Sequence, residues 1–374
     1  MKKGWQTKTL GETCEVVNGG TPKTGVPEYW DGQHRWITPA EMGKRLSPYV
    51  SETERMISDL GLRNSSAQML PPHSVILSSR APIGHLVINT ELMATNQGCK
   101  GLIPRSQLQH KFLYYYLSSI VDLLNSLGTG ATFKELSGGK LKEVEIPAPP
   151  LAEQQRIVGL LDEAFEGLAT AKANAEKNLQ NARALFESHL QSVFTQRGPG
   201  WVEKTLGDIC VVDWGNTDLT KSSYVEGGKF LAVSAAGCDG RIGHKEHAKH
   251  TPVLSAIGAQ CGRMFLPEED FTAIKNTITL TPRDDTCAGK FLYRLLTHVE
   301  LPKRGAAQPF IAKGDILKFQ IVVPEDSEAQ LRIVDSLAAL EEETQSLARL
   351  YERKHAALEA LKKSLLHQAF AGEL

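Results

Sequence analysis

Signals for membrane insertion, metal binding and catalysis are scarce in this sequence. No uninterrupted apolar stretch reaches the roughly 20 residues that a membrane-spanning helix needs, and the lysines after Met1 precede no apolar segment. The six cysteines are scattered, without a CxxC pair or a Cys/His spacing that would build a zinc site. A GxxxxGK(S/T) phosphate loop, a GxGxxG segment and an Asn/Asp-Pro-Pro-Tyr segment are missing. We therefore expect a cytoplasmic protein with free thiols, no metal site and no catalytic residues of its own.

The chain also has little net charge, −1 at pH 7 with histidine neutral. Neither half is strongly basic, and much of the acid lies in residues 324–374. The carboxylates of Glu268, Glu269 and Asp270 match no nuclease cluster, and they are more typical of a charged turn. Any contact with nucleic acid must therefore come from local basic clusters or be shared with partner subunits.

Two long segments, residues 152–194 and 328–370, have the apolar spacing of a coiled coil. Apolar residues recur at alternating steps of four and three with charged residues between them, so the two segments are predicted to be helices that pack together. Two unrelated amphipathic helices would leave the shared phase of the segments unexplained. Asn178 and Lys354 fall at core positions, where they would either fix the register or mark wet helix ends. The predicted core positions are Ile157, Leu161, Leu168, Leu185, Ile333, Leu337, Leu340, Leu347, Leu358 and Leu361.

An internal repeat accompanies the two helices. The segment beginning at Trp5 returns at Trp201 with its Lys-Thr-Leu-Gly, Cys and Val residues in register, and residues 153–158 return at 329–334. Short β-rich runs broken by Gly and Pro alternate with helix-like runs in each half, which predicts mixed α/β units. We therefore expect four parts, with boundaries at 1–149 (globular), 150–196 (helix), 197–323 (globular) and 324–374 (helix).

The motifs at these junctions resemble the specificity subunit of type I restriction-modification systems. They are Pro150-Leu151-Ala152-Glu153-Gln154-Gln155-Arg156-Ile157-Val158, the segment 366–374, and the segments 18–22, 36–39, 78–84 and 96–98. The resemblance covers nearly the whole chain and implies two target recognition domains joined by antiparallel helices in a pseudo-twofold arrangement. It also implies a non-catalytic subunit that recognises a bipartite, asymmetric double-stranded DNA target.

The resemblance further implies partners and cofactors. Two methyltransferase subunits would dock on the helices, and restriction/translocase subunits would join for cleavage. S-adenosylmethionine, ATP and Mg²⁺ are expected on those partner subunits and none of them on this chain. The competing interpretation is a non-enzymatic coiled-coil adaptor whose globular domains bind protein or carbohydrate. Salt-dependent DNA binding would separate the two, because contacts to phosphates impose a steep dependence on salt.

Candidate DNA contacts lie in loop-like, Gly- and Ser-rich segments of both halves. Arg80, Asn96 and Gln97 stand out because they sit in motif-like loops, although the segment Ser78-Ser79-Arg80 could instead bond the backbone at a turn. The densest basic run is 241–250; its three histidines suggest a metal site less strongly than a DNA-contacting loop. The candidates are Thr21, Lys23, Arg35, Lys44, Arg80, Asn96, Gln97, Lys100, Lys134, Lys221, Arg241, His244, Lys245, Lys249, Arg263, Asn276 and Gln308.

Overall fold

The computed structural model describes residues 4–130, 134–283 and 288–374. The chain divides into two compact units, one formed by residues 1–175 with 353–374 and the other by residues 176–352. No described helix is both long and apolar enough to cross a membrane. The described cysteines, at 14, 99, 210, 238 and 261, form no disulfide, and Cys287 lies outside the described residues.

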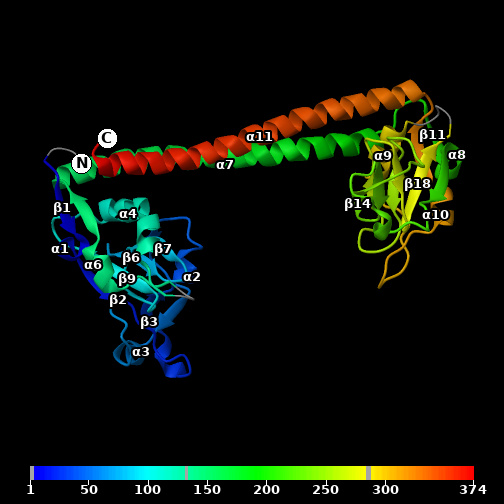
Figure 1. Ribbon diagram of the computed structural model, residues 1–374. Coiled ribbons are helices and arrows are strands. Elements are labelled where there is room, and N and C mark those ends of the chain that lie inside the picture. Colours follow the sequence, from blue (N-terminus) through cyan, green and yellow to red (C-terminus); the bar gives the residue numbers. More distant parts are fainter. Residues whose placement is uncertain (1–3, 131–133, 284–287) are drawn as a thin grey trace. The chain divides into compact units, whose positions relative to one another are not determined.

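A five-stranded sheet forms the centre of the first unit. The central strand β6 (Val75–Ser79) is buried along its whole length, and its side chains alternate between two cores. Val75 and Leu77 pack on one face and Ile76 on the other. Helix α4 (His110–Ser119) contributes to the core of Val75 and Leu77, and Figure 1 shows this helix beside the sheet. The strand order is β2 (Cys14–Asn18), β9 (Cys99–Pro104), β6 (Val75–Ser79), β7 (Ile83–Asn89) and β4 (Tyr49–Val50).

Two smaller sheets complete the first unit. In the three-stranded sheet, β3 (Trp30–Ile37) lies between β5 (Arg55–Ile57) and β8 (Met93–Thr95), and Trp30 and Trp36 form its core. The ribbon of β1 (Gln6–Thr9) and β10 (Glu145–Ala148) is antiparallel. The short helices are α1 (Leu10–Thr13), η1 (Pro27–Tyr29), α2 (Pro39–Met42), α3 (Asp59–Arg63), α5 (Val121–Leu127) and α6 (Gly138–Glu143).

The second unit repeats this arrangement with a shorter chain. Its main sheet has the order β12 (Cys210–Trp214), β18 (Thr277–Pro282), β15 (Val253–Ser255) and β16 (Met264–Phe265). Its second sheet has the order β14 (Gly237–Ile242), β13 (Phe230–Ser234) and β17 (Phe271–Ala273), and its ribbon pairs β11 (Trp201–Thr205) with β19 (Gln320–Pro324). The helices are α8 (Leu206–Ile209), η2 (Lys221–Ser223), α9 (Gly289–Leu296) and α10 (Lys313–Leu317).

Strand neighbours correspond one to one between the units. The order β2-β9-β6-β7 matches β12-β18-β15-β16, and the parallel pair β3/β8 matches the parallel pair β13/β17. Both units open with the same capping box, in which a threonine caps a four-residue helix. Among the described residues of the second unit, no strand corresponds to β4. The repeat that the sequence predicted therefore extends through the topology of both units.

Each unit contains one end of each long helix, α7 (Leu151–Thr195) and α11 (Ser327–Ala371). In the first unit the start of α7 lies beside the end of α11, where Lys172 Nζ is 2.7 Å from Glu359 Oε1. In the second unit the end of α7 lies beside the start of α11, where Arg183 Nη2 is 2.9 Å from Glu352 Oε1. The two helices are therefore antiparallel in each unit, as predicted.

Most of the predicted core positions of the helix pair lie on its packed face. Ile157, Leu161 and Leu337 are fully buried or nearly so. Half-buried side chains make up the rest of this set, namely Leu168, Ile333, Leu340, Leu347 and Leu358.

The prediction is wrong for Leu185 and Leu361, which are 52% and 47% exposed. In this part of α7 the packed face contains Leu179, Ala182 and Phe186. The predicted spacing placed the first and last of these positions one residue earlier, at Asn178 and Leu185. An error of one residue turns a helical side chain by about 100°, which moves it out of the interface. Asn178 and Lys354 are exposed for the same reason, so neither fixes the register from the core.

A buried glutamine ties each long helix to the globular part that precedes it. Gln154 is fully buried; its amide accepts a hydrogen bond from the Gln109 N–H (2.9 Å) and donates to the carbonyls of Gln107 (2.9 Å) and Pro149 (2.8 Å). Its counterpart Gln330 accepts from the Ala288 N–H (3.0 Å) and donates to the Pro324 carbonyl. These bonds explain why this residue recurs in the repeated segments 153–158 and 329–334.

Replacing Gln154 by leucine is expected to lower the free energy of unfolding of the first unit by about 1–3 kcal/mol, because buried backbone groups lose their partners. Urea denaturation measures the change. The matched control is the exposed neighbour in Gln155→Leu, which should stay within about 0.5 kcal/mol of the wild type. Equal losses in both variants would contradict the role given to Gln154.

Replacing Leu347 by aspartate is expected to lower the free energy of unfolding by about 1.5–3 kcal/mol, because its half-buried side chain loses apolar contact with the paired helix. Thermal melting followed by circular dichroism at the helix band measures the loss. The control is Leu350→Asp, since Leu350 is 50% exposed on the same helix. A control that melts as early as Leu347→Asp would show that the packed face is misplaced.

Candidate nucleic-acid interface

Three predicted residues of the first unit meet at the end of its main sheet. Asn96 Nδ2 donates to Thr21 Oγ1 at 2.9 Å, and the Thr21 hydroxyl donates to Gln97 Oε1. The Gly98 N–H donates to Asn96 Oδ1 at 2.8 Å, and the Asn96 N–H bonds the carbonyl of Ile37 at the end of β3. The network holds Asn96 half-buried and leaves the Gln97 side chain exposed.

Arg80 lies against this network. A Cβ placed on Gly98 would lie 3.2 Å from Arg80 Cγ and 3.1 Å from Asn96 Oδ1, so the two loops approach each other closely at this glycine. The Arg80 side chain is 38% exposed, and its Nη1 is 3.9 Å from Glu135 Oε2. Its backbone forms a β-bridge with Glu135, which places the exposed Lys134 next to it. Thr21, Arg80, Asn96, Gln97 and Lys134 are together called the first loop cluster.

Ser78, two residues before Arg80 in the motif, has a structural role. Ser78 Oγ accepts hydrogen bonds from the N–H groups of Gly84 (3.1 Å) and His85 (2.8 Å) and donates to the Pro82 carbonyl (2.8 Å). The turn-binding alternative therefore holds for Ser78, which is buried. The guanidinium of Arg80 takes no part in these hydrogen bonds.

The other predicted residues of the first unit lie outside this cluster. Lys100 was expected in a loop, but it is on β9, where it pairs with Asn18 and Leu77 and is only 6% exposed. That expectation is wrong because the strand begins one residue earlier, at Cys99. Arg35 is half-buried on β3, Lys44 is paired with Glu54 at 3.0 Å, and Lys23 is exposed after Thr21.

Carboxylates pair with the basic run 241–250 of the second unit. Arg241 contacts Glu269 at 2.8 Å, Lys245 contacts Asp270 at 2.5 Å, and the side chain of Glu268 lies 2.9 Å from His250. The hydrogen bond from Lys245 holds the pKa of Asp270 below its usual value. The turn formed by Glu268, Glu269 and Asp270 therefore opposes the positive charge of the densest basic run.

The histidines of this run are held apart. His244 lies 3.3 Å from Glu246, and His247 stacks on Phe271 with ring centroids 5.1 Å apart. Burial lowers the pKa of His247. Within residues 4–130, 134–283 and 288–374, no three His, Cys, Asp or Glu side chains are arranged to hold a metal ion.

The remaining predicted residues of the second unit are dispersed. Lys221 pairs with Asp239 at 2.6 Å, and Arg263 contacts Gln260 at 3.2 Å. Asn276 has a φ of 71°, a left-handed conformation that asparagine tolerates better than most residues. Lys249 and Gln308 are exposed.

The second unit repeats the backbone of the first loop cluster with different side chains. The Ala256 N–H bonds the Asn276 carbonyl (2.9 Å), as the Ser79 N–H bonds the Gly98 carbonyl (2.7 Å). The bridge Ile257–Phe310 repeats the bridge Arg80–Glu135, and Arg304–Phe310 repeats Thr129–Glu135. Ile257, Lys275, Arg304 and Phe310 are together called the second loop cluster.

Sequence reasoning missed Ile257 and Phe310, whereas Arg304 was a lesser candidate for a DNA contact. The segment Val253-Leu254-Ser255 is similar to Ile76-Leu77-Ser78, and extending this alignment by two residues aligns Ile257 with Arg80. Ile257 and Phe310 are apolar, whereas DNA contacts were expected from charged and amide side chains.

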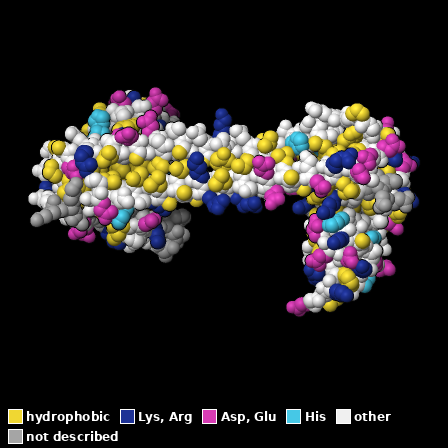
Figure 2. Space-filling model, turned by 90° about the horizontal axis from the view of Figure 1, so that it is seen from above, with side chains coloured by type: hydrophobic (Ala, Val, Ile, Leu, Met, Phe, Trp, Pro, Cys, Tyr) yellow, Lys and Arg dark blue, Asp and Glu magenta, His cyan; other side chains and the backbone are white. Residues whose placement is uncertain are grey.

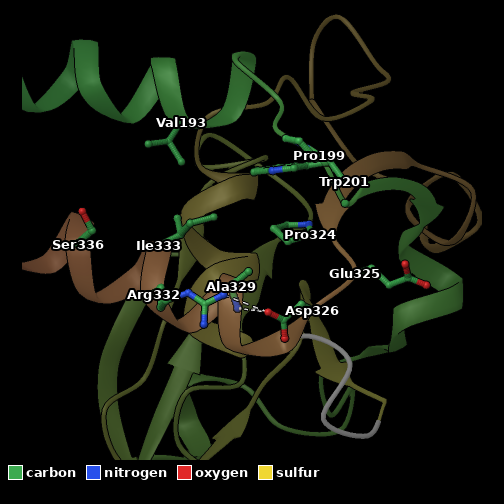
Figure 3. A pocket seen from close by; sticks show the side chains of 11 residues that line it. Val193, Pro199, Trp201, Pro324, Glu325, Asp326, Ala329, Arg332, Ile333 and Ser336 are labelled. Carbon is green, nitrogen blue, oxygen red and sulfur yellow. Dashed lines mark hydrogen bonds and ion pairs between the residues drawn. The ribbon is translucent and has the colours of Figure 1, made fainter.

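A hollow of about 680 Å³ lies elsewhere in the second unit, beside the first turns of α11 (Figure 3). Val193, Trp201 and Ile333 contribute apolar walls. Arg332 and Asp326 in its lining are paired, since Arg332 Nη2 is 3.1 Å from Asp326 Oδ2, and Asp326 also accepts hydrogen bonds from the first N–H groups of the helix. The hollow shares none of its lining residues with the second loop cluster.

Two α/β units of one topology, each packed on paired antiparallel helices, define a protein built from duplicated recognition modules. A family model described as the type I restriction modification DNA specificity domain matches residues 2–179 and 199–353. The chain therefore belongs to this family.

Individual relatives are consistent with the family. The MjaIX specificity subunit of Methanocaldococcus jannaschii is 33% identical over 250 residues, which cover 62% of this chain and 58% of that protein. The EcoR124I/EcoR124II specificity subunit of Escherichia coli is 33% identical over 162 residues, or 41% of this chain and 39% of that protein. The matched segments thus span less than two thirds of these relatives.

Solved structures share the fold across the whole chain. A structure described as explaining complex assembly and conformational transition of the type I R-M system has a TM-score of 0.78 at 20% identity, covering 100% of this chain and 99% of its own. The HsdS subunit from Thermoanaerobacter tengcongensis has a TM-score of 0.68 at 19% identity, with coverage of 100% and 98%.

Replacing Lys245 by methionine is expected to raise the pKa of Asp270 toward its usual value, because the hydrogen bond that stabilises the carboxylate is removed. Because the pKa of Asp270 is lowered in the folded protein, its interaction with Lys245 stabilises the fold at pH values above the unfolded-state pKa. This stabilisation is lost as the pH falls through the folded-state pKa. An NMR titration of the Asp270 side-chain carboxyl measures this pKa. An unchanged pKa would show that Lys245 is not the partner of Asp270 in solution.

Proposed function

We propose that this chain is the non-catalytic DNA-recognition subunit of a type I restriction-modification complex. The observation that carries the proposal is the family match to both units, each of which has the same loop framework at the end of its main sheet. A framework repeated twice in one chain suits the reading of two half-sites. Because the side chains on the two frameworks differ, the half-sites would differ, and the target would be bipartite and asymmetric.

The first loop cluster has the chemistry of base readout. Arginine makes paired hydrogen bonds to guanine, and asparagine or glutamine to adenine, in the major groove of DNA. Arg80 and Gln97 are the members with accessible side-chain donors, while Thr21 and Asn96 hold the loop in shape. Lys134 is placed to neutralise a phosphate. The remaining candidates, including Lys23, Arg35 and Lys44, stay predictions.

The long helices are the proposed docking surfaces for two methyltransferase subunits. Apolar side chains remain on their outer faces, where Leu160, Leu185, Leu331, Leu350 and Leu361 are 43–52% exposed (Figure 2). The partners would supply S-adenosylmethionine chemistry and flip the target base out of the duplex. ATP and Mg²⁺ would belong to restriction/translocase subunits, and the assembly would act in the cytoplasm.

The proposal is tested by co-expressing this chain with the methyltransferase subunit encoded beside it and mapping methylated adenines across the host genome by single-molecule sequencing. The expected result is one bipartite asymmetric motif with a fixed spacer. Exchange of residues 201–323 with those of another family member should change one half of the motif only. A stable complex that leaves no motif would contradict the proposal and favour the adaptor interpretation.

Replacing Arg80 by alanine is expected to weaken DNA binding by about 1–3 kcal/mol and to relax the preference at one position of one half-site. Binding of the co-expressed complex to variant duplexes, measured at fixed salt, gives both quantities. The control is Arg105→Ala, because Arg105 is exposed just beyond the opposite end of β9. Unchanged affinity and preference for Arg80→Ala would remove Arg80 from the interface.

A further inference from the structure

The second loop cluster is built as firmly as the first. The Arg304 N–H and the Phe310 N–H each donate to the other residue's carbonyl at 2.8 Å, so the ends of this loop are pinned together. The Ile311 N–H bonds the Ala256 carbonyl and the Gly258 N–H bonds the Pro309 carbonyl, which ties this loop to the one after β15. The backbone therefore presents the side chains at 257, 304 and 310 in a defined arrangement.

An aromatic side chain is exposed on this rigid backbone. Phe310 is 39% exposed although it lies between two β-bridges, and Ile257 opposite it is half-buried. Apolar side chains recognise the methyl group of thymine in the major groove, and phenylalanine can also wedge between base steps. Exposed aromatic surface held by the backbone is thus suited to contact base edges rather than phosphates.

Lysine and arginine side chains lie around the second loop cluster, and few carboxylates oppose their charge. A Cβ on Gly262 would lie 2.4 Å from Lys303 Cε, so Lys303 lies over the turn that leads to Arg263. Arg304 pairs with Asp315 at 2.5 Å. For Arg263, Lys275 and Lys303, the structure records no carboxylate partner among the described residues. Phosphates approaching this surface meet less opposing charge than at the run 241–250, where Glu268, Glu269 and Asp270 stand close by.

We propose that the second unit reads its half-site through Ile257 and Phe310, and that the run 241–250 is not the reading surface. The inference rests on the proposed function and deepens it. The ligand is duplex DNA with a thymine at the position facing Phe310, and Arg304, Lys303 and Arg263 supply contacts to the phosphates on either side. Each unit then reads its half-site from its own copy of the same backbone framework. The reading side chains are polar in the first unit and apolar in the second.

The test uses the co-expressed complex with the neighbouring methyltransferase subunit and maps methylated adenines for the wild type, Phe310→Ala, Arg304→Ala and Lys245→Ala. Phe310→Ala is expected to lose about 10-fold or more of its discrimination for thymine at one position of the half-site read by the second unit. The other half and the spacer should stay as in the wild type. Arg304→Ala should lower methylation at all sites without changing the motif.

Val225→Ala is the matched control, because Val225 is an apolar residue that is 51% exposed and bonded to the backbone of Arg241 beside the basic run. Its motif should not change. If Phe310→Ala fails to assemble, Phe310→Gln replaces it, since glutamine keeps the length of the side chain but removes the apolar contact with the thymine methyl group. A second half that stays unchanged in the Phe310 variant would overturn the inference while leaving the proposed function intact. A second half that changes in Lys245→Ala would likewise overturn it, because the run 241–250 would then be the reading surface. A wild-type complex without any motif would contradict both.

Discussion

The buried amide of Gln154, and that of Gln330 in the second unit, is the interaction on which the arrangement of each unit depends. It bonds backbone groups of the globular part and of the proline-bearing exit strand at the first turn of a long helix. Because these groups are buried, a hydrophobic residue could not replace the amide without leaving them unpaired. Each globular unit is thereby held to its own helix in one orientation, as the proposed reading of two spaced half-sites would require.

Recognition is separated from this scaffold. The backbone hydrogen bonds that shape the loops are the same in both units, while the side chains they present are Arg80 and Glu135 in one and Ile257 and Phe310 in the other. Function on such a fold resides in the loops, because they tolerate substitution that the sheet does not. Under the proposed function, specificity would therefore change in one half-site without disturbing the other unit or the helices.

Much of the architecture could be predicted from the repeated motifs, because Trp5 with Trp201 and Gln154 with Gln330 mark equivalent positions in the two units, of which the two glutamines are fully buried. The phase of the helix pair could not be predicted throughout, since Leu185 and Phe186 are both apolar and only packing decides between them. The sequence also concealed the pairing of Lys245 with Asp270, which are distant in the chain. Phe310 was overlooked because an exposed aromatic residue looks like a core residue until its surroundings are known.

Under the proposed function, each unit presents its reading side chains from the same backbone framework. A cryo-electron microscopy structure of the complete complex on its own methylation target would test this arrangement. Base edges of one half-site should lie against Arg80 and Gln97 and those of the other half-site against Ile257 and Phe310. Base edges in contact with residues 241–250 instead, with Phe310 facing solvent, would contradict it.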